Sequence, residues 1–306
     1  MAVLARSIAT IVWLAATAGL GWAQEDGPQP WQTSYQTPAS QVMEYVDWFS
    51  WYTVVIMSAI VLLVIGLIAW CAWRYNERAN PVPDRITHNT TVEVLWTVVP
   101  VLILVAIAIP SFRLLYGQYD PARLYEDFDP ETTEWLTVKV TGLSNWSWQA
   151  DYDNCEENAG QGVSDPIQFQ IYRVPDDQLA EGQPRLLTAD NPVVVPIDTF
   201  VRVHVTADQG IIHALGLPAF GLKVDAVPGR LNETYFKAER EGLFYGQCSE
   251  LCGKDHAFMP INFEVVSQDE FRQWAAGAGA EFPGEACPAA AEAAEAKGDV
   301  TNLAAR

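Results

Sequence analysis

The sequence predicts a membrane-anchored all-β protein, in which a two-helix transmembrane hairpin precedes a Greek-key β-barrel or sandwich. Three observations predict this fold class. Two apolar runs without charge lie before residue 117, short segments with two-residue alternation follow residue 134, and one loop in that second region gathers cysteine, histidine and methionine. The 306 residues are enough for about two domains, and 50% of them are hydrophobic.

Residues 1–23 have the pattern of a cleaved secretory signal peptide. Arg6 lies in a basic beginning, a short apolar run follows, and small residues surround Ala23. The alternative is a third membrane helix, which the shortness of the run and its glycines disfavour. Residues 24–47 are then expected to form an exported N-terminal segment.

Residues 48–116 are expected to form the hairpin, with helices at about 48–73 and 92–114. The first run holds no charged residue over about 26 positions, which at 1.5 Å per residue gives roughly 39 Å of helix, enough to cross a bilayer with tilt. The second run, 94–112, gives roughly 28 Å and contains two prolines, which membrane helices tolerate better than soluble ones.

Three arginines, Arg74, Arg78 and Arg85, lie in the loop between the two runs. Positive charge beside membrane helices favours the cytoplasmic side, so both outer ends of the hairpin are expected in the periplasm. Together with the signal peptide, this predicts a two-helix protein of a bacterial inner membrane whose C-terminal domain is periplasmic.

Residues 117–134 have the composition of a linker, because they are polar and contain two Asp-Pro steps that discourage helix. Residues 135–276 show about eight short alternating segments, which is typical of a Greek-key domain, and close with a capped helix from residue 267. Residues 277–306 are rich in Ala, Gly and Glu and are expected to be a disordered tail. The expected strands are 135–140, 146–152, 166–174, 193–207, 220–228, 233–239, 242–248 and 261–266.

A loop between the last two expected strands holds Cys248, Cys252, His256 and Met259. Thiolate, thioether and imidazole ligands favour copper over magnesium, calcium or manganese, and methionine is unusual at structural zinc. A strand-loop-strand hairpin can bring such ligands to one point. His213, at the end of another expected strand, could complete the set, although a lone histidine beside apolar residues is more often simply packed.

The segment LPAFGLKVDAVPGRLNETYFKAEREGLFYGQCSELCGKDHAFMP closely resembles subunit II of haem-copper cytochrome c oxidases. The resemblance extends over the hairpin and the exported domain. It implies a cupredoxin-like Greek-key β-barrel that carries CuA, a centre of two copper ions bridged by two cysteine thiolates and capped by one histidine each. The implied ligands are His213, Cys248, Glu250 through its backbone carbonyl, Cys252, His256 and Met259.

The resemblance also implies a function, the electron-accepting subunit of a proton-pumping terminal oxidase. Such a subunit takes electrons from cytochrome c and passes them to haem in subunit I, where oxygen is reduced to water; subunit III is a further expected partner. This chain has four histidines and no C-x-x-C-H motif, so it cannot hold the haems itself, and no acid-base catalytic residue is expected in it. The net charge of −20 argues against nucleic acid as a partner.

Two other functions stay open from the residues. A CuA domain could serve a different reductase, such as one for nitrous oxide, although the two-helix anchor argues against that. A structural subunit of a quinol oxidase that has lost its copper would resemble this fold, although Cys248 and Cys252 argue against it.

Two glutamates acquire roles from the resemblance. The side chain of Glu250 would bind a magnesium ion at the junction with subunit I, for which a carboxylate is a suitable hard ligand; the alternative is a solvated loop acid. Glu93, at the cytoplasmic end of the second helix, would lie at the entrance of a proton path into subunit I. Its alternative is a carboxylate that simply stabilises a helix N-terminus.

Trp146 and Trp148 alternate along an expected strand, which would place them on one face, where one could receive the electron. The family pattern is glycine, two residues and W-Y-W, whereas this chain has one extra residue after Gly142 and Ser147 in place of the tyrosine. Aligned backwards from Tyr152, Trp146 takes the electron-accepting position. The alternative is two core tryptophans.

Acidic residues gather around the same strand. They would steer a basic donor such as cytochrome c, because complementary fields raise the rate of encounter more than the affinity. The alternative is an ordinary solubilising surface. The expected docking residues are Asp151, Asp153, Glu156 and Glu157.

Three cysteines lie outside the copper loop. Cys71 falls in the first membrane helix and is expected to be a buried small apolar residue. Cys155 and Cys287 would both be exported to an oxidising compartment, so they are expected to form a disulfide that ties the tail to the acidic loop.

Overall fold

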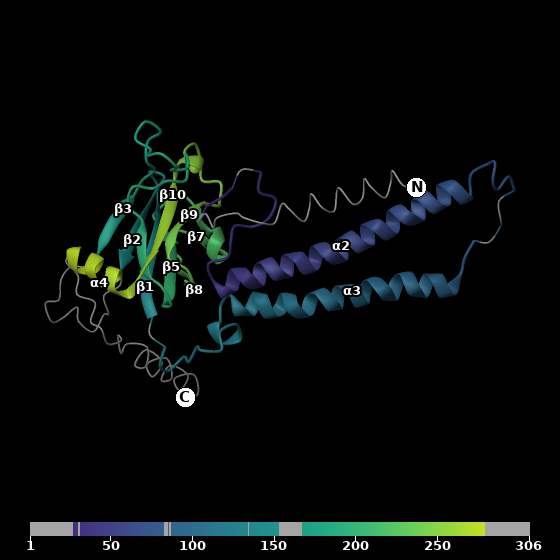
Figure 1. Cartoon of the computed structure of the whole chain (residues 1–306), viewed down its shortest axis with the longest axis horizontal. Helices are drawn as coiled ribbons and strands as arrows, with labels where there is room; N and C mark the ends of the chain where they lie inside the picture. Colours follow the sequence, from purple (N-terminus) through teal and green to yellow (C-terminus); the bar gives the residue numbers. More distant parts are fainter. Residues whose placement is uncertain are drawn as a thin grey trace, which may run out of the picture.

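The computed structural model describes residues 27–29, 31–82, 85, 87–133, 135–152 and 167–278. Figure 1 shows two long helices lying side by side and projecting from one end of a β-domain. The predicted signal peptide, nearly all of the predicted tail, and the predicted residues Asp153, Cys155, Glu156, Glu157 and Cys287 lie outside the described residues.

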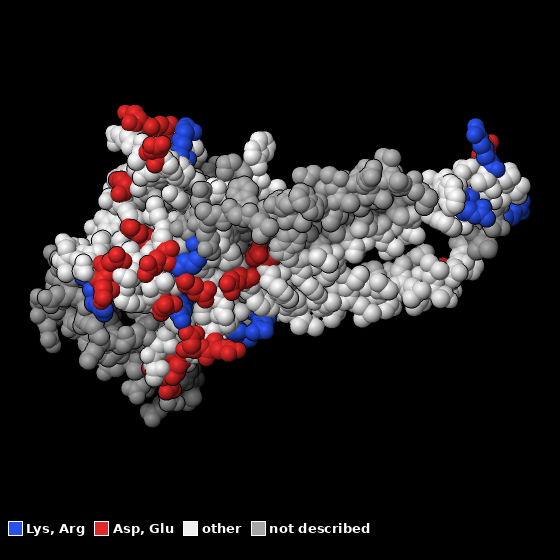
Figure 2. Space-filling model, viewed as in Figure 1, with Lys and Arg blue, Asp and Glu red and all other residues white. Residues whose placement is uncertain are grey.

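The two helices are α2 (Gln41–Arg74) and α3 (Thr90–Gly117). Their most apolar windows have mean hydropathies of 2.9 and 2.6 and are wholly unburied, so both helices are long and apolar enough to cross a membrane. The loop between them carries the basic side chains at the far end of the hairpin, and acidic side chains spread over the β-domain (Figure 2).

Helix α2 begins seven residues before the predicted start at residue 48. Ser40 caps it, because its Oγ accepts a hydrogen bond from the Met43 amide at 3.2 Å. Val42 and Met43 are buried, since this first turn packs against the β-domain rather than lying free in the periplasm. The charged residues near the start of α2 interrupt the apolar run in the sequence, but the helix continues through them.

Ten described strands form two five-stranded sheets, with orders β3-β2-β1-β5-β8 and β4-β10-β9-β6-β7. β1 and β5 pair in parallel, as do β4 and β10, and the other named neighbours are antiparallel. The strands are β1 (Trp135–Leu143), β2 (Ser147–Tyr152), β3 (Gln168–Ile171), β4 (Val193–Pro196), β5 (Phe200–Ala207), β6 (His213–Leu217), β7 (Leu222–Ala226), β8 (Asn232–Lys237), β9 (Gly242–Cys248) and β10 (Pro260–Val266).

The inner faces of the two sheets share one hydrophobic core. Phe236 on the first sheet meets Phe263 on the second edge to face, with ring centroids 5.9 Å apart. Strand alternation explains the core, because inward positions such as Val138 and Val203 are fully buried. The closing helix α4 (Gln268–Gly277) carries a capping box between Ser267 and Glu270, as its sequence predicts.

The strand pattern differs from the prediction in two places. The predicted strand 193–207 is two strands, because Asp198 adopts a left-handed φ of 58° and turns the chain from one sheet to the other. Residues 213–217 form an additional strand, β6, and His213 begins it rather than ending a strand.

The predicted linker 117–134 packs on the domain. A 3-10 turn, η1 (Pro121–Arg123), leads to Leu124 and Tyr125, which are buried in a second hydrophobic cluster with Val42. Because the segment is polar overall, its sequence did not indicate that these two residues are buried. The connection between membrane helix and β-domain is consequently held in place rather than free.

Candidate metal centre

The predicted copper ligands come from two neighbouring strands and the loop that follows one of them. β6 begins at His213, β9 ends at Cys248, and the two strands pair with Leu215 opposite Cys248. Residues 249–259 then form a loop that returns the chain to β10, where Pro260 pairs with Gln247. This topology brings all the predicted side chains to one end of the second sheet.

The ligand atoms converge around the two cysteine sulfurs. The Sγ atoms of Cys248 and Cys252 lie 3.8 Å apart. Cys248 Sγ lies 3.8 Å from His213 Nδ1 and 3.3 Å from the carbonyl oxygen of Glu250. Cys252 Sγ lies 3.5 Å from His256 Nδ1 and 3.6 Å from Met259 Sδ. Each cysteine sulfur thus has one imidazole and one weaker potential ligand beside it.

The site is shielded from water. His213 is fully buried, Met259 is 2% exposed and each cysteine is 7% exposed. The sulfurs are too far apart for a disulfide, which needs about 2.05 Å, whereas two sulfurs bound at about 2.3 Å to one metal ion at a tetrahedral angle lie roughly 3.8 Å apart. Two buried thiols, a buried thioether, the buried imidazole of His213 and the half-buried imidazole of His256 at this spacing fit a copper site better than a site built for a hard cation.

Burial also sets the protonation of the side chains at the site. Burial, reinforced by the neighbouring Cys248, raises the pKa of the Cys252 thiol to about 12. Burial lowers the pKa of His213 and keeps its imidazole neutral at pH 7. A neutral imidazole is the form that binds a metal, and a metal that binds Cys252 must displace a proton from its sulfur.

Glycines make room for the site. A Cβ at Gly142 on β1 would lie 2.7 Å from His213 Cδ2, so the imidazole ring fits only because residue 142 has no side chain. A Cβ at Gly246 on β9 would lie 2.6 Å from the backbone oxygen of Gly216 on β6. The sequence contains both glycines, but nothing in it shows which atoms they face.

The two tryptophans differ in setting. Trp148 is fully buried, donates from Nε1 to the Met259 carbonyl at 3.1 Å, and lies with its ring 5.9 Å from that of His213. Trp146 precedes β2 in a left-handed turn with φ 59°, is half-buried, and donates from Nε1 to the Cys252 carbonyl at 3.1 Å. Strand alternation does not reach Trp146, so the expectation of one shared strand face is wrong. Both indoles instead donate hydrogen bonds to residues 249–259, which we call the ligand loop.

Other predicted site residues lie apart from the sulfurs. The Glu250 side chain is exposed. Glu93, in the first turn of α3, accepts a hydrogen bond from the Asn89 amide at 3.0 Å, which is the helix-stabilising arrangement weighed as its alternative. Asp151 lies toward the other end of β2 from Trp146, four residues or roughly 13 Å beyond Ser147, where the strand begins. The predicted disulfide and the other docking acids involve residues outside the described part of the chain.

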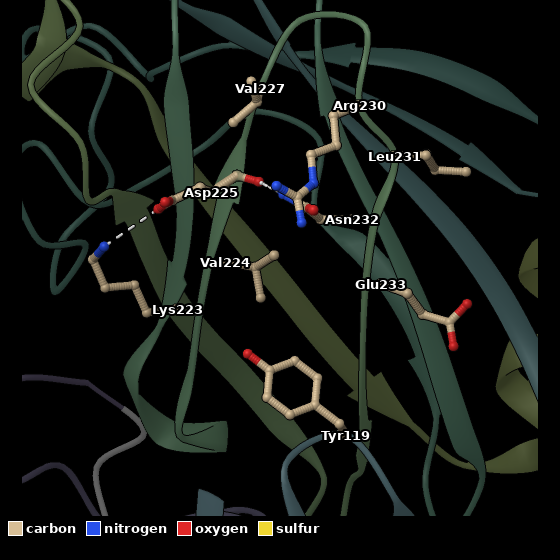
Figure 3. A pocket seen from close by; sticks show the side chains of 9 residues that line it. All are labelled: Tyr119, Lys223, Val224, Asp225, Val227, Arg230, Leu231, Asn232 and Glu233. Carbon is tan, nitrogen blue, oxygen red and sulfur yellow. Dashed lines mark hydrogen bonds and ion pairs between the residues drawn. The ribbon is translucent and has the colours of Figure 1, made fainter. Parts of the chain in front are cut away.

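Two further features do not belong to the site. Cys71 is a free, exposed cysteine on α2, so within this chain it is not the buried residue that the sequence predicts. A cavity of about 600 Å³ lies along β7 and β8, lined by oppositely charged side chains such as Lys223 and Glu233 and by Tyr119, which follows α3 (Figure 3). None of the predicted copper ligands lines it.

Comparison with known proteins places the whole arrangement in a family. The model of the cytochrome c oxidase subunit II periplasmic domain matches residues 136–266, and the model of the subunit II transmembrane domain matches residues 28–114. These matches agree with the β-domain and the helical hairpin of the structure.

Individual relatives agree with the family models. The probable cytochrome c oxidase subunit 2 of Rickettsia felis is 42% identical over 270 residues, covering 88% of this chain and 78% of the relative. Cytochrome c oxidase subunit 2 of Zea mays is 39% identical over 253 residues, covering 81% and 90%. The crystal structure of the periplasmic domain of subunit II from Bradyrhizobium japonicum shares 47% identity, covers 48% of this chain and 96% of that chain, and has a TM-score of 0.41. The two family models and the two curated relatives show that the chain belongs to the cytochrome c oxidase subunit II family.

Proposed function

We propose that this subunit receives electrons from cytochrome c at a binuclear CuA centre and passes them to haem in subunit I, where the oxidase reduces oxygen to water and pumps protons. The observation that carries the proposal is the convergence of two thiols, two imidazole Nδ1 atoms, a thioether and a backbone carbonyl within 3.3 to 3.8 Å contacts. Cys248 and Cys252 would bridge the two ions. His213 and His256 would bind one ion each, with Met259 and the Glu250 carbonyl as weaker ligands.

The chain's own contribution is to keep these ligands in a fixed arrangement that is shielded from water. A bound copper pair supplies reversible one-electron acceptance with little change in bond lengths. The residues supply ligand identity, a buried setting and a loop fixed by two indole hydrogen bonds from Trp146 and Trp148. Little reorganisation of the ligands is then needed when an electron arrives or leaves. No acid-base catalytic residue is required.

The other roles extend this proposal beyond the copper ligands. Trp146 is the proposed point of electron uptake, because its half-buried ring contacts the ligand loop directly. The exposed Glu250 carboxylate is proposed to bind magnesium at the junction with subunit I, and Glu93 to lie at a proton-path entrance. Subunit III is a further proposed partner. Residues 48–116 would anchor the subunit in a bacterial inner membrane with the β-domain in the periplasm.

The two alternative functions are weaker. A copper-free structural subunit of a quinol oxidase has no use for buried, adjacent thiols with imidazole and thioether neighbours. A CuA domain of another reductase, such as one for nitrous oxide, would not need the two apolar helices.

The test is electron paramagnetic resonance of the full-length chain, purified in detergent and loaded with copper. Hyperfine structure from two equivalent copper nuclei and a copper content of about two ions per chain are expected. Cys248→Ser and Cys252→Ser should abolish that signal, whereas Cys71→Ser, which removes a free cysteine on α2, should leave it unchanged. A mononuclear signal in the unmodified chain would rule out the CuA assignment.

A further inference from the structure

The imidazole of His213 has one edge on the metal site and one edge buried without a partner. Nδ1 faces Cys248 Sγ at 3.8 Å. Nε2, on the opposite edge, makes no hydrogen bond to any residue that the structure describes, although the whole side chain is buried. Buried polar atoms are rarely left unsatisfied, so this nitrogen needs a partner.

A second buried polar atom without a partner lies beside this edge. Asp208 follows β5, and its amide donates to the Gly142 carbonyl at 2.9 Å. Gly142 is the residue against which the His213 ring packs, with Cδ2 2.7 Å from the position of a Cβ there. Cδ2 adjoins Nε2 in the ring. The backbone of Asp208 is therefore fixed to the residue that backs the unpartnered edge of the imidazole.

The Asp208 carboxylate is held by one oxygen only. Oδ2 accepts a hydrogen bond from the Ser144 hydroxyl at 3.0 Å. Oδ1 is buried and has no partner among the described residues. Asp208 and His213 therefore both lie against Gly142, one through its backbone and the other through its ring. The Leu143 backbone carbonyl also lies near the imidazole, but Nε2 has no partner in hydrogen-bond geometry among the described residues.

We propose that Asp208 is a positioning residue for the copper site: its free Oδ1 accepts the Nε2 proton of His213, directly or through one water, and so holds Nδ1 as the metal-binding nitrogen. A single donor and a single acceptor, each buried and otherwise unsatisfied, would satisfy each other. Metal-binding histidines commonly donate their second N–H to a carboxylate in this way, which fixes the tautomer and the ring orientation. Ser144 and Gly142 keep the carboxylate in position. The inference rests on the proposed function, since it needs His213 to bind a metal.

Two consequences separate this role from a merely structural one. The hydrogen bond orients the ring, so its loss should weaken metal binding by about 10- to 100-fold. The negative charge stabilises the more positive, oxidised state of the site, so its loss should raise the reduction potential. An acid that only closed a loop would change neither property while the fold was intact.

The experiment uses the full-length chain in detergent and compares Asp208→Ala with Asp208→Asn. Copper affinity is measured by competition with a chelator, the site by electron paramagnetic resonance, and the reduction potential by titration. Asp208→Ala should lose affinity 10- to 100-fold and change the histidine-dependent hyperfine splitting. Asp208→Asn keeps an acceptor oxygen and should recover most of the affinity while still raising the potential. Asp269→Asn, an exposed acid on α4, is the matched control for charge and should change none of these.

Cobalt(II) binding, followed by thiolate-to-cobalt absorption, is measured on the same variants. If the unmodified chain shows no copper-pair signal, the proposed function fails, yet Asp208→Ala should still weaken cobalt binding if the positioning role is right. Wild-type affinity, spectrum and potential in an Asp208→Ala protein with native circular dichroism would overturn the inference. Equal effects of Asp208→Asn and Asp269→Asn would also overturn the inference. If Asp208→Ala does not fold, Ser144→Ala provides a milder variant.

Discussion

At the scale of single residues, Trp146 combines a costly backbone conformation with contacts that offset its cost. A large side chain at φ 59° costs about 1–3 kcal/mol and persists only where its surroundings hold it. Here the indole donates to the Cys252 carbonyl, and its ring packs on Gly253, where a Cβ would lie 3.0 Å from Cζ2. The strained turn and the ligand loop therefore stabilise each other's conformation. Strain of this kind is typical of functional sites.

Trp146→Phe tests whether the indole receives the electron. The variant keeps an aromatic ring but loses the hydrogen bond to the ligand loop. We expect the copper spectrum to persist and electron uptake from cytochrome c to slow by about fivefold or more, since a hydrogen bond contributes about 1 kcal/mol. Stopped-flow mixing of the assembled oxidase with reduced cytochrome c measures the rate.

Trp148→Phe is the control for that variant. Trp148 is fully buried and donates to the Met259 carbonyl, so its replacement should disturb the spectrum as well as the rate. Wild-type uptake by Trp146→Phe would assign the role to Trp148 or to another residue.

At the scale of elements, the approach of β6 to β9 determines whether the ligands meet. His213 begins β6 and Cys248 ends β9, so the spacing of these strands sets the spacing of the two side chains. A Cβ at Gly246 would lie 2.6 Å from the Gly216 oxygen and 3.0 Å from the Ile261 oxygen. Both are backbone atoms of flanking strands, which cannot rotate away. Close pairing across Gly246 is thus a condition for the copper site.

Gly246→Ala should push these strands apart. Overpacking of this kind typically costs about 1–3 kcal/mol, and copper binding should weaken in parallel because His213 moves relative to Cys248. Thermal unfolding and chelator competition on the purified chain measure the two effects. Gly277→Ala at the end of α4 has nothing within 4 Å of the added methyl and should be neutral or slightly stabilising. Equal behaviour of the two variants would contradict the proposed role of the close approach.

The join between hairpin and β-domain includes an ion pair with a predictable pH response. Lys237 on β8 is only 16% exposed, and its Nζ lies 2.5 Å from Oδ2 of Asp127, which is 60% exposed. The hydrogen bond from Lys237 lowers the pKa of Asp127 below its usual value. The ionised carboxylate therefore favours the folded state above about pH 4, and this contribution is lost as the pH falls through the lowered native pKa.

Asp127→Asn should consequently lower stability by about 0.5–1 kcal/mol at pH 7, a value reduced by the exposure of Asp127 to solvent. The difference from the unmodified chain should shrink as the pH falls below about 4. Thermal unfolding at a series of pH values measures it. Asp225→Asn removes a pair in which both partners are more than half exposed and should have little effect at any pH. A pH-independent loss in Asp127→Asn would show that the ion pair is not its cause.

At the scale of the whole molecule, sequence reasoning succeeded where chemistry is local in the chain. Charge-free runs predicted both helices, and two cysteines, a histidine and a methionine within a dozen residues predicted a loop whose side chains the structure brings together. It was weaker where contacts are distant. Cys248 lies 35 residues beyond His213, which alone could have been a packed histidine, and the left-handed turn at Trp146 broke the alternation. Nothing in the sequence pairs Asp208 with His213, because the proposed contact depends on how the turn between β5 and β6 packs against Gly142.

The distribution of charge is also a property of the whole molecule. Figure 2 shows basic side chains at the far end of the hairpin and acidic ones over the β-domain, and the chain carries a net charge of −20. The basic end agrees with a cytoplasmic loop. The acidic domain should attract a basic donor over distances of about a Debye length, which is roughly 10 Å at 0.1 M salt. Steering of this kind changes the rate of encounter more than the strength of the complex.

The rate at which basic cytochrome c reduces the assembled oxidase should therefore fall about tenfold or more between about 10 mM and about 200 mM salt. Asp151→Asn, on the outer side of β2, should slow the reaction at low salt and reduce its salt dependence. Asp225→Asn makes the same charge change on β7 of the other sheet and should do neither. Stopped-flow rates at several salt concentrations separate two explanations. Equal effects of the two variants would mean that net charge alone attracts the donor. A larger effect at Asp151 would mean that the donor docks on the sheet that carries it, the same sheet whose β1–β2 turn presents Trp146.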